Sequence, residues 1–130
     1  MFLYACGSEN KEAKGETIDN KNLQMSERLE GVKITYRYEK GNQYSVKFED
    51  DSLSYQFHKG GKKSKRWIGP YAYNHLITDM NQHMVAWNEP DKQDYVTLLI
   101  NFDKMSLYGS AILKGKKQHF QKAEITELVE

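Results

Sequence analysis

The sequence predicts a single all-β domain, an antiparallel barrel of about eight strands behind a disordered polar leader. Apolar and polar residues alternate in most runs after residue 31, which is the period of a half-buried strand. These runs are short and are separated by Gly, Pro, Asn and Asp. Nine tyrosines against two prolines, in 130 residues, also favour strands within one domain.

The strands are expected in the following order. Residues 32–38 alternate clearly, and a turn at 40–42 leads to residues 44–48 and then 53–57. A loop at 60–65 precedes a short run at 66–68, and Pro70 discourages a central strand there. Residues 71–80 fit either a short strand or a helical turn. The remaining runs lie at 85–89, 95–102, 107–113 and 119–129, and about eight strands of this kind are typical of a sandwich or an up-and-down barrel that holds one small ligand.

Residues 1–30 are interpreted as a leader and residues 31–130 as the barrel. The first residues are apolar up to Cys6 and polar afterwards, with Leu3 and Ala5 at positions −3 and −1 from the cysteine. This pattern resembles the lipobox of bacterial lipoproteins, although the basic and apolar segments of a full secretory signal are missing. A frayed start with a chance cysteine is the alternative. The polar residues that follow have too little apolar surface to fold and would serve as a tether.

Composition and spacing argue against several classes of function. Lys and Arg total 19 against 18 for Asp and Glu, so no strong field favours a nucleic acid. The four histidines show no metal-ligand spacing, and we expect no metal and no cofactor. The single cysteine cannot form an internal disulfide. No phosphate-binding glycine loop or nucleophile motif is present, and nothing after residue 6 has the length of a membrane span.

Four residues are candidates for chemistry inside the barrel. Tyr36 and Tyr38 are two apart and leave the same face of a strand. Glu89 shares a face with Trp87, and burial would favour the protonated carboxyl group of a proton donor. Arg66 could hold a carboxylate in a forked pair. Periodicity alone favours the alternative, in which the tyrosines are ordinary strand residues and Glu89 and Arg66 face water or form structural pairs.

The order of these residues resembles the phenolic acid decarboxylases and the MoaF-related domains that share their lipocalin-like (calycin) barrel. The resemblance covers most of residues 31–126 and rests on Gly31-(x4)-Tyr36-x-Tyr38-Glu39-x-Gly41-x-x-Tyr44, Tyr55-x-x-His58-x-Gly60, Arg66-Trp67, Trp87-x-Glu89-Pro90, Asn101-Phe102, Gly109 and Ala123-Glu124-Ile125-Thr126. It implies that Tyr36, Tyr38, Arg66 and Glu89 are catalytic. By the same resemblance and by their strand positions, Tyr44, Trp67 and Trp87 would contact the ligand.

The sequence also departs from that family. The segment between the last two strands shrinks to residues 114–122, which would remove part of the pocket wall. Asn42, Asn88 and Tyr108 stand where the family has Trp, Thr and His. These differences bear on the substrate more than on the fold.

The resemblance therefore implies a cofactor-independent decarboxylase acting on a hydroxycinnamate-type acid within the barrel. The alternative is a non-enzymatic, lipid-anchored binding protein for a small aromatic or apolar ligand, since one fold serves both binders and catalysts. Membrane attachment through Cys6 predicts a cell-envelope location, with the cytoplasm as the alternative. The resemblance further implies a homodimer.

Overall fold

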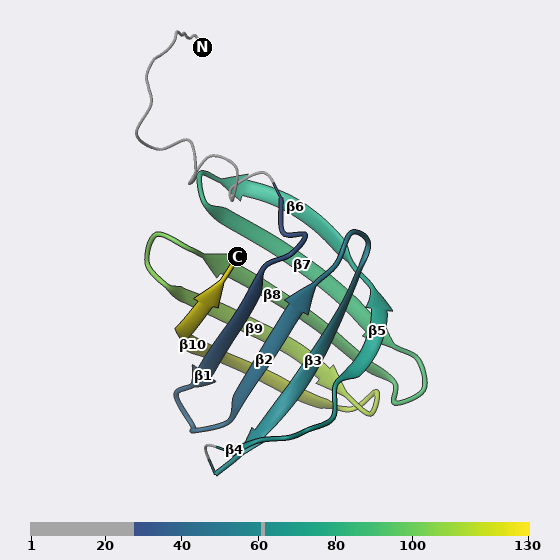
Figure 1. The fold of residues 1–130 in the computed structure, drawn as a ribbon. Coiled ribbons are helices and arrows are strands. Elements are labelled where there is room, and N and C mark those ends of the chain that lie inside the picture. Colours follow the sequence, from purple (N-terminus) through teal and green to yellow (C-terminus); the bar gives the residue numbers. More distant parts are fainter. Residues whose placement is uncertain (1–27, 61) are drawn as a thin grey trace, which may run out of the picture.

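The protein forms one antiparallel sheet that curls into a barrel (Figure 1). The structure, a computed structural model, describes residues 28–60 and 62–130, so Cys6 and the expected leader up to residue 27 lie outside the described part. The strands are β1 (Lys33–Tyr38), β2 (Gln43–Phe48), β3 (Ser52–Lys59), β4 (Lys62–Lys63), β5 (Ile68–Ala72), β6 (Asn74–Asp79), β7 (Gln82–Glu89), β8 (Asp94–Asn101), β9 (Ser106–Leu113) and β10 (Lys117–Val129).

The strand order is β4-β3-β2-β1-β10-β9-β8-β7-β6, and β5 pairs with β3 beside this path. The chain passes directly from β5 into β6, and β5 also contacts β7, so it spans the gap between the two ends of the sheet. The barrel is therefore nearly closed. The described residues contain no helix, and hence none long and apolar enough to cross a membrane.

The predicted all-β antiparallel barrel is confirmed, with ten strands in place of about eight. One of the additional strands is the two-residue β4, which lies within the expected loop at 60–65. The other arises because residues 71–80 divide between the end of β5 and β6. Pro70 lies in β5, which pairs with β3 alone among the strands, and such a border position tolerates a residue that lacks an N–H donor.

Strand alternation determines which side chains face the interior. In β7 the side chains of His83, Val85, Trp87 and Glu89 are buried, whereas the residues between them are half-buried or exposed. The core extends back to Leu29, which is 2% exposed. The packed domain therefore includes at least one residue of the segment expected to be a tether.

Candidate active site

A buried carboxyl group lies at one end of the barrel interior, at the last residue of β7. Glu89 is 2% exposed. Its Oε1 accepts a hydrogen bond from the Tyr55 hydroxyl at 2.8 Å, and its Oε2 accepts one from Trp87 Nε1 at 3.0 Å. Both carboxyl oxygens thus have hydrogen-bond partners, as a buried polar group requires.

A lysine completes the surroundings of this carboxyl group. Lys92 lies in the turn between β7 and β8, and its Nζ is 3.5 Å from Glu89 Oε1. The same Nζ donates to the Tyr55 hydroxyl at 3.1 Å. Glu89, Tyr55 and Lys92 therefore form a connected polar group that begins in the interior and ends at the solvent.

Three tyrosines from β1 and β2 lie next to one another in the same interior. The ring centroids of Tyr36 and Tyr38 are 5.5 Å apart, and those of Tyr36 and Tyr44 are 6.0 Å apart. Tyr44 in turn lies 6.3 Å from Tyr55, the residue bonded to Glu89. Register explains the arrangement, because Tyr36 pairs directly with Tyr44 across the two strands.

These phenols are neutral hydrogen-bond donors at ordinary pH. Burial raises the pKa of Tyr36 well above its usual value, and the neighbouring Tyr38 raises it further. Burial also raises the pKa of Tyr38 to about 12. For Tyr44, burial and then the charge of Glu89 raise the pKa. A set of protonated phenols next to a carboxyl group can bind an anionic or strongly polar end of a ligand.

Gly109 in β9 makes room for one of these hydroxyl groups. A Cβ atom at position 109 would lie 2.2 Å from the Tyr38 hydroxyl oxygen and 3.0 Å from its ring carbons. The His119 ring packs against Tyr38 from β10, with 4.7 Å between centroids. Tyr38 is thus held between a glycine and an imidazole, which fixes its orientation.

The structure therefore brings together several of the residues singled out in the sequence. Tyr36, Tyr38 and Tyr44 form one cluster, and Tyr55 joins it to Glu89 and Trp87. The sequence analysis missed Tyr55 and Lys92 as site residues. Alternation of Leu53, Tyr55 and Phe57 along β3 could have identified the tyrosine, whereas Lys92 lies in a turn that carries no such signal.

Two other candidates lie apart from this cluster. Arg66 lies in the loop after β4 with an exposed side chain, and its backbone nitrogen donates to Ser64 Oγ at 3.1 Å. Trp67 is half-buried, with Lys47 Nζ 4.3 Å from its ring centroid. Lys47 alternates with the buried Val46 and Phe48 and so lies on the outward face of β2.

The histidines occupy three separate places, and that of His119, beside Tyr38, is described above. His58 is buried and contacts Ser45 Oγ through Nε2 at 2.8 Å, on the opposite face of the sheet from the tyrosines. His75 Nε2 lies 2.7 Å from His83 Nδ1, and the two rings stack. Across residues 28–60 and 62–130, no three His, Cys, Asp or Glu side chains are grouped so that they could hold a metal ion.

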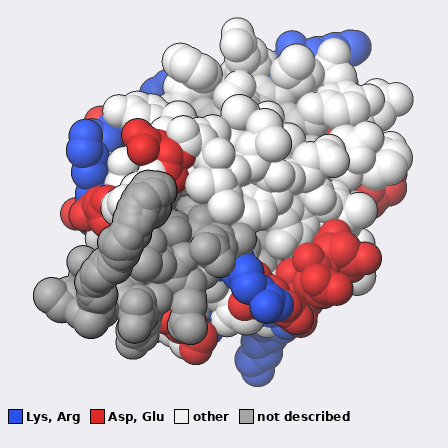
Figure 2. Space-filling model, turned by 90° about the horizontal axis from the view of Figure 1, so that it is seen from above, with Lys and Arg blue, Asp and Glu red and all other residues white. Residues whose placement is uncertain are grey.

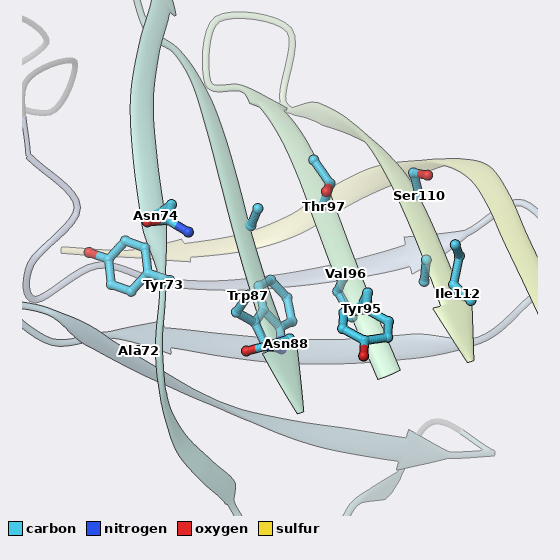
Figure 3. Close-up of a pocket in the computed structure, with 12 residues that line it drawn as sticks. Ala72, Tyr73, Asn74, Trp87, Asn88, Tyr95, Val96, Thr97, Ser110 and Ile112 are labelled. Atoms are coloured by element: carbon cyan, nitrogen blue, oxygen red, sulfur yellow. The ribbon is translucent and has the colours of Figure 1, made fainter. Parts of the chain in front are cut away.

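A separate hollow of about 510 Å³ lies over β5 to β9 (Figure 3). By strand alternation, most of its lining side chains belong to the outward face, and Tyr95 and Ile112 are 49% and 46% exposed. Trp87 lines it too, but the four clustered tyrosines and Glu89 do not. The hollow is therefore distinct from the tyrosine cluster.

Comparisons with known proteins bear on the fold and the family of this chain. A crystal structure described as a putative beta-lactamase from Burkholderia vietnamiensis superposes with a TM-score of 0.66 at 15% identity, covering 78% of this chain and 95% of that one. At that identity the likeness concerns the fold alone. No curated protein matches in sequence. The family model for phenolic acid decarboxylase (PAD), however, matches residues 26–119, a span that contains the tyrosines of β1 to β3, Trp87, Glu89 and Gly109. Since this match covers most of the chain, the protein belongs to the phenolic acid decarboxylase family.

Proposed function

We propose that the protein is a cofactor-independent decarboxylase of hydroxycinnamate-type aromatic acids, with Glu89 as the proton donor. The observation that carries this proposal is the enclosed Glu89 carboxyl group, 2% exposed, beside a cluster of phenols and an indole. An enclosed acid protected from bulk water, next to aromatic side chains that suit an aromatic substrate, is what proton transfer to a carbon atom requires.

The reaction needs one proton delivered to carbon and one taken from the substrate. Glu89 would protonate the double-bond carbon that bears the carboxylate while the para-phenol loses its proton to solvent, which gives a quinone methide. Carbon dioxide then leaves, and the electrons of the broken bond return to the ring and restore the phenolate. Reprotonation gives the vinylphenol. Tyr36 and Tyr38 would bind one polar end of the substrate through their hydroxyl groups.

The test measures the rate at which p-coumarate absorbance is lost, with the purified wild-type protein and with the Glu89→Gln variant. Because general acids typically contribute about a hundredfold or more, we expect kcat to fall at least that far in the variant. His75→Gln, a change in the pair of histidines away from Glu89, is the matched control and should retain activity. An unchanged rate in Glu89→Gln would remove Glu89 from the reaction.

A binding protein without turnover is the second candidate. The exposed position of Arg66 favours it, because Glu89 has its hydrogen bonds and ion pair with Tyr55, Trp87 and Lys92 and none with the arginine that the family resemblance assigns to catalysis. Calorimetry of p-coumarate binding, combined with detection of the product, separates the two functions. A p-coumarate complex that forms without release of 4-vinylphenol would identify a binder, and product release would identify an enzyme.

We also propose that a second copy of the chain covers the outward face of β6 to β9. One outward position of these four strands is charged, Asp79 at the end of β6, which pairs with Gln82 after a register shift. The other outward positions are uncharged, namely Asn74, Leu76, Thr78, Gln82, Met84, Ala86, Asn88, Tyr95, Thr97, Leu99, Asn101, Ser106, Tyr108, Ser110 and Ile112. Much of the surface seen in Figure 2 likewise lacks charged side chains. A face with almost no charge suits an identical face across a two-fold axis, and depletion of charge is typical of the centre of an interface.

Sedimentation velocity tests this surface. The wild-type protein should sediment as a dimer, and Tyr108→Glu, which places a charge on a 53% exposed position of the face, should sediment as a monomer. Gln43→Glu, on the outward face of β2, should remain dimeric. A monomeric wild-type protein at high micromolar concentration would contradict the proposal.

The leader suggests a further proposal, that lipid on Cys6 attaches the protein to the cell envelope. It rests on the spacing of Leu3, Ala5 and Cys6 and on the polar residues that follow. Cys6→Ser in the natural precursor should move the protein from the membrane fraction to the soluble fraction. A wild-type protein that carries no lipid by mass spectrometry would contradict it.

A further inference from the structure

Lys92 is the cation that the structure places at the buried carboxyl group. The turn after β7 closes with Lys92 N donating to the Glu89 carbonyl at 3.0 Å, which returns the lysine toward the end of its own strand. Its Nζ then lies 3.5 Å from Glu89 Oε1 and 3.1 Å from the Tyr55 hydroxyl. Sequence spacing alone does not reveal this arrangement.

Lys92 faces two environments. Its side chain is 39% exposed, while the carboxyl group that it contacts is 2% exposed. An ammonium group has three donors, and two of them point toward Tyr55 and Glu89. The third remains available on the solvent side, from which a ligand would arrive. The flexible four-carbon stem allows the ammonium group to move toward that ligand without loss of its anchor in the turn.

We propose that Lys92 binds the carboxylate of the incoming substrate and so makes the site selective for anionic aromatic ligands. The inference rests on the proposed function and deepens it by assigning the carboxylate to a residue. Lys92 would exchange part of its contact with Glu89 for the carboxylate of the ligand. Glu89 would then be released from its ion pair as the substrate arrives and would take from solvent the proton that it later gives to carbon, with Tyr55 and Trp87 still holding it in place.

A purely structural role for Lys92 makes a different prediction. If the lysine only neutralised Glu89, its removal would leave the charge of Glu89 uncompensated and would disfavour anionic ligands indirectly. The comparison is therefore made in the Glu89→Gln background as well as in the wild type, because there a merely neutralising lysine would alter the binding of charged and uncharged ligands equally. If it binds the carboxylate, its removal should affect only ligands that carry one. The decisive quantity is therefore the ratio between the dissociation constants of an ester and of its parent acid.

The experiment measures these two constants by isothermal titration calorimetry. The probes are 3-(4-hydroxyphenyl)propanoate, which lacks the double bond and cannot be turned over, and its methyl ester. The wild-type protein should prefer the acid. Lys92→Met should weaken binding of the acid by about tenfold to a hundredfold, the range expected for a charge-assisted hydrogen bond, and leave the ester nearly unchanged. Lys92→Arg should keep most of the preference, because the charge remains.

Lys104→Met is the matched control, since Lys104 is exposed in the turn between β8 and β9, at the other end of β8 from Lys92. It should change neither constant. Equal effects of Lys92→Met on acid and ester would overturn the role of Lys92 and leave the proposed function intact. Absence of binding of both probes to the wild-type protein would overturn the proposed function and this inference with it.

Discussion

Besides the tyrosines, the described part of the barrel interior holds two buried ionisable groups, Glu89 and His83, and their surroundings differ. Glu89 is bonded by Tyr55 and Trp87 and lies 3.5 Å from Lys92, which reaches solvent. His83 is fully buried, contacts His75 at 2.7 Å and packs 5.4 Å from Phe102. The first group has donors and a cation suited to a negative charge. His83 lies beside the Phe102 ring and the His75 imidazole, and these surroundings suit an uncharged imidazole ring.

This difference supports the proposal that the Glu89 group serves function and that the histidine pair stabilises the fold. Burial lowers the pKa of His75, which favours the neutral ring and therefore a packing role. The Glu89 group instead continues to the protein surface through Lys92. Changes near Glu89 should accordingly alter ligand handling, and changes at the histidine pair should alter stability.

The largest effect in this comparison is expected from Gly109→Ala. The new Cβ would fall 2.2 Å from the Tyr38 hydroxyl oxygen, so Tyr38 has to move out of the cluster. We expect turnover of p-coumarate to fall by at least about tenfold and stability by about 1–3 kcal/mol, the usual cost of overpacking. Steady-state kinetics and urea unfolding measure the two.

A second substitution sharpens this result. Tyr38→Phe removes the atom nearest to the new methyl group, so the double variant should recover part of the stability lost in Gly109→Ala. Recovery of stability without recovery of turnover would show that the Tyr38 hydroxyl is needed for chemistry. Gly109→Ala with full activity would contradict the description of the tyrosine cluster as a site.

An intermediate effect is expected from His83→Leu. The substitution leaves His75 without a buried hydrogen-bond partner, and such a loss typically costs about 1–3 kcal/mol. Because the pair is separate from Glu89, the affinity for 3-(4-hydroxyphenyl)propanoate should stay within about twofold once the protein is folded. A large loss of affinity in a stable His83→Leu protein would show that the two polar groups are coupled.

The smallest effect is the pH dependence of stability that the histidines cause. The pKa of His75 is below 6.5 in the folded protein because of burial, so the unfolded chain binds more protons below that pH. Stability should therefore fall as the pH decreases through 6.5. His119 acts in the same direction, through burial and the charges of Lys40 and Lys117. Urea midpoints at pH 7.5 and 5.5 should differ less in His75→Gln than in the wild type, and an equal difference would exclude His75.

Strand alternation explains how much of this site the sequence predicts. Tyr36, Tyr38, Trp87 and Glu89 all lie in regular strands, where a period of two determines the inward face, and all four are buried. The sheet as a whole follows from the same pattern. Its ends do not, because β4 and β5 pair only at the border of β3 and carry little alternation.

Positions outside regular strands could not be predicted in this way. Lys92 reaches Glu89 through the geometry of a turn, and Arg66 lies in the loop between β4 and β5, where a period of two does not apply. The requirement for Gly109 is also non-local, because it depends on a tyrosine in β1 that approaches β9 across the interior. Such contacts become visible only once the barrel is assembled.

The central claim, that the Glu89 end of the interior receives the ligand, can be tested with the two tryptophans of the chain. Trp87 Nε1 donates to Glu89 Oε2, whereas Trp67 lies against Lys47 on the outward face. Their two indole N–H signals can be followed in a ¹H–¹⁵N NMR titration with 3-(4-hydroxyphenyl)propanoate. We predict that the Trp87 signal shifts to saturation while the Trp67 signal stays in place, and that Tyr95→Ala, which alters the separate hollow that Trp87 also lines, leaves this shift unchanged. A shift of the Trp67 signal alone, or no shift of either at saturating ligand, would contradict the assignment of this site.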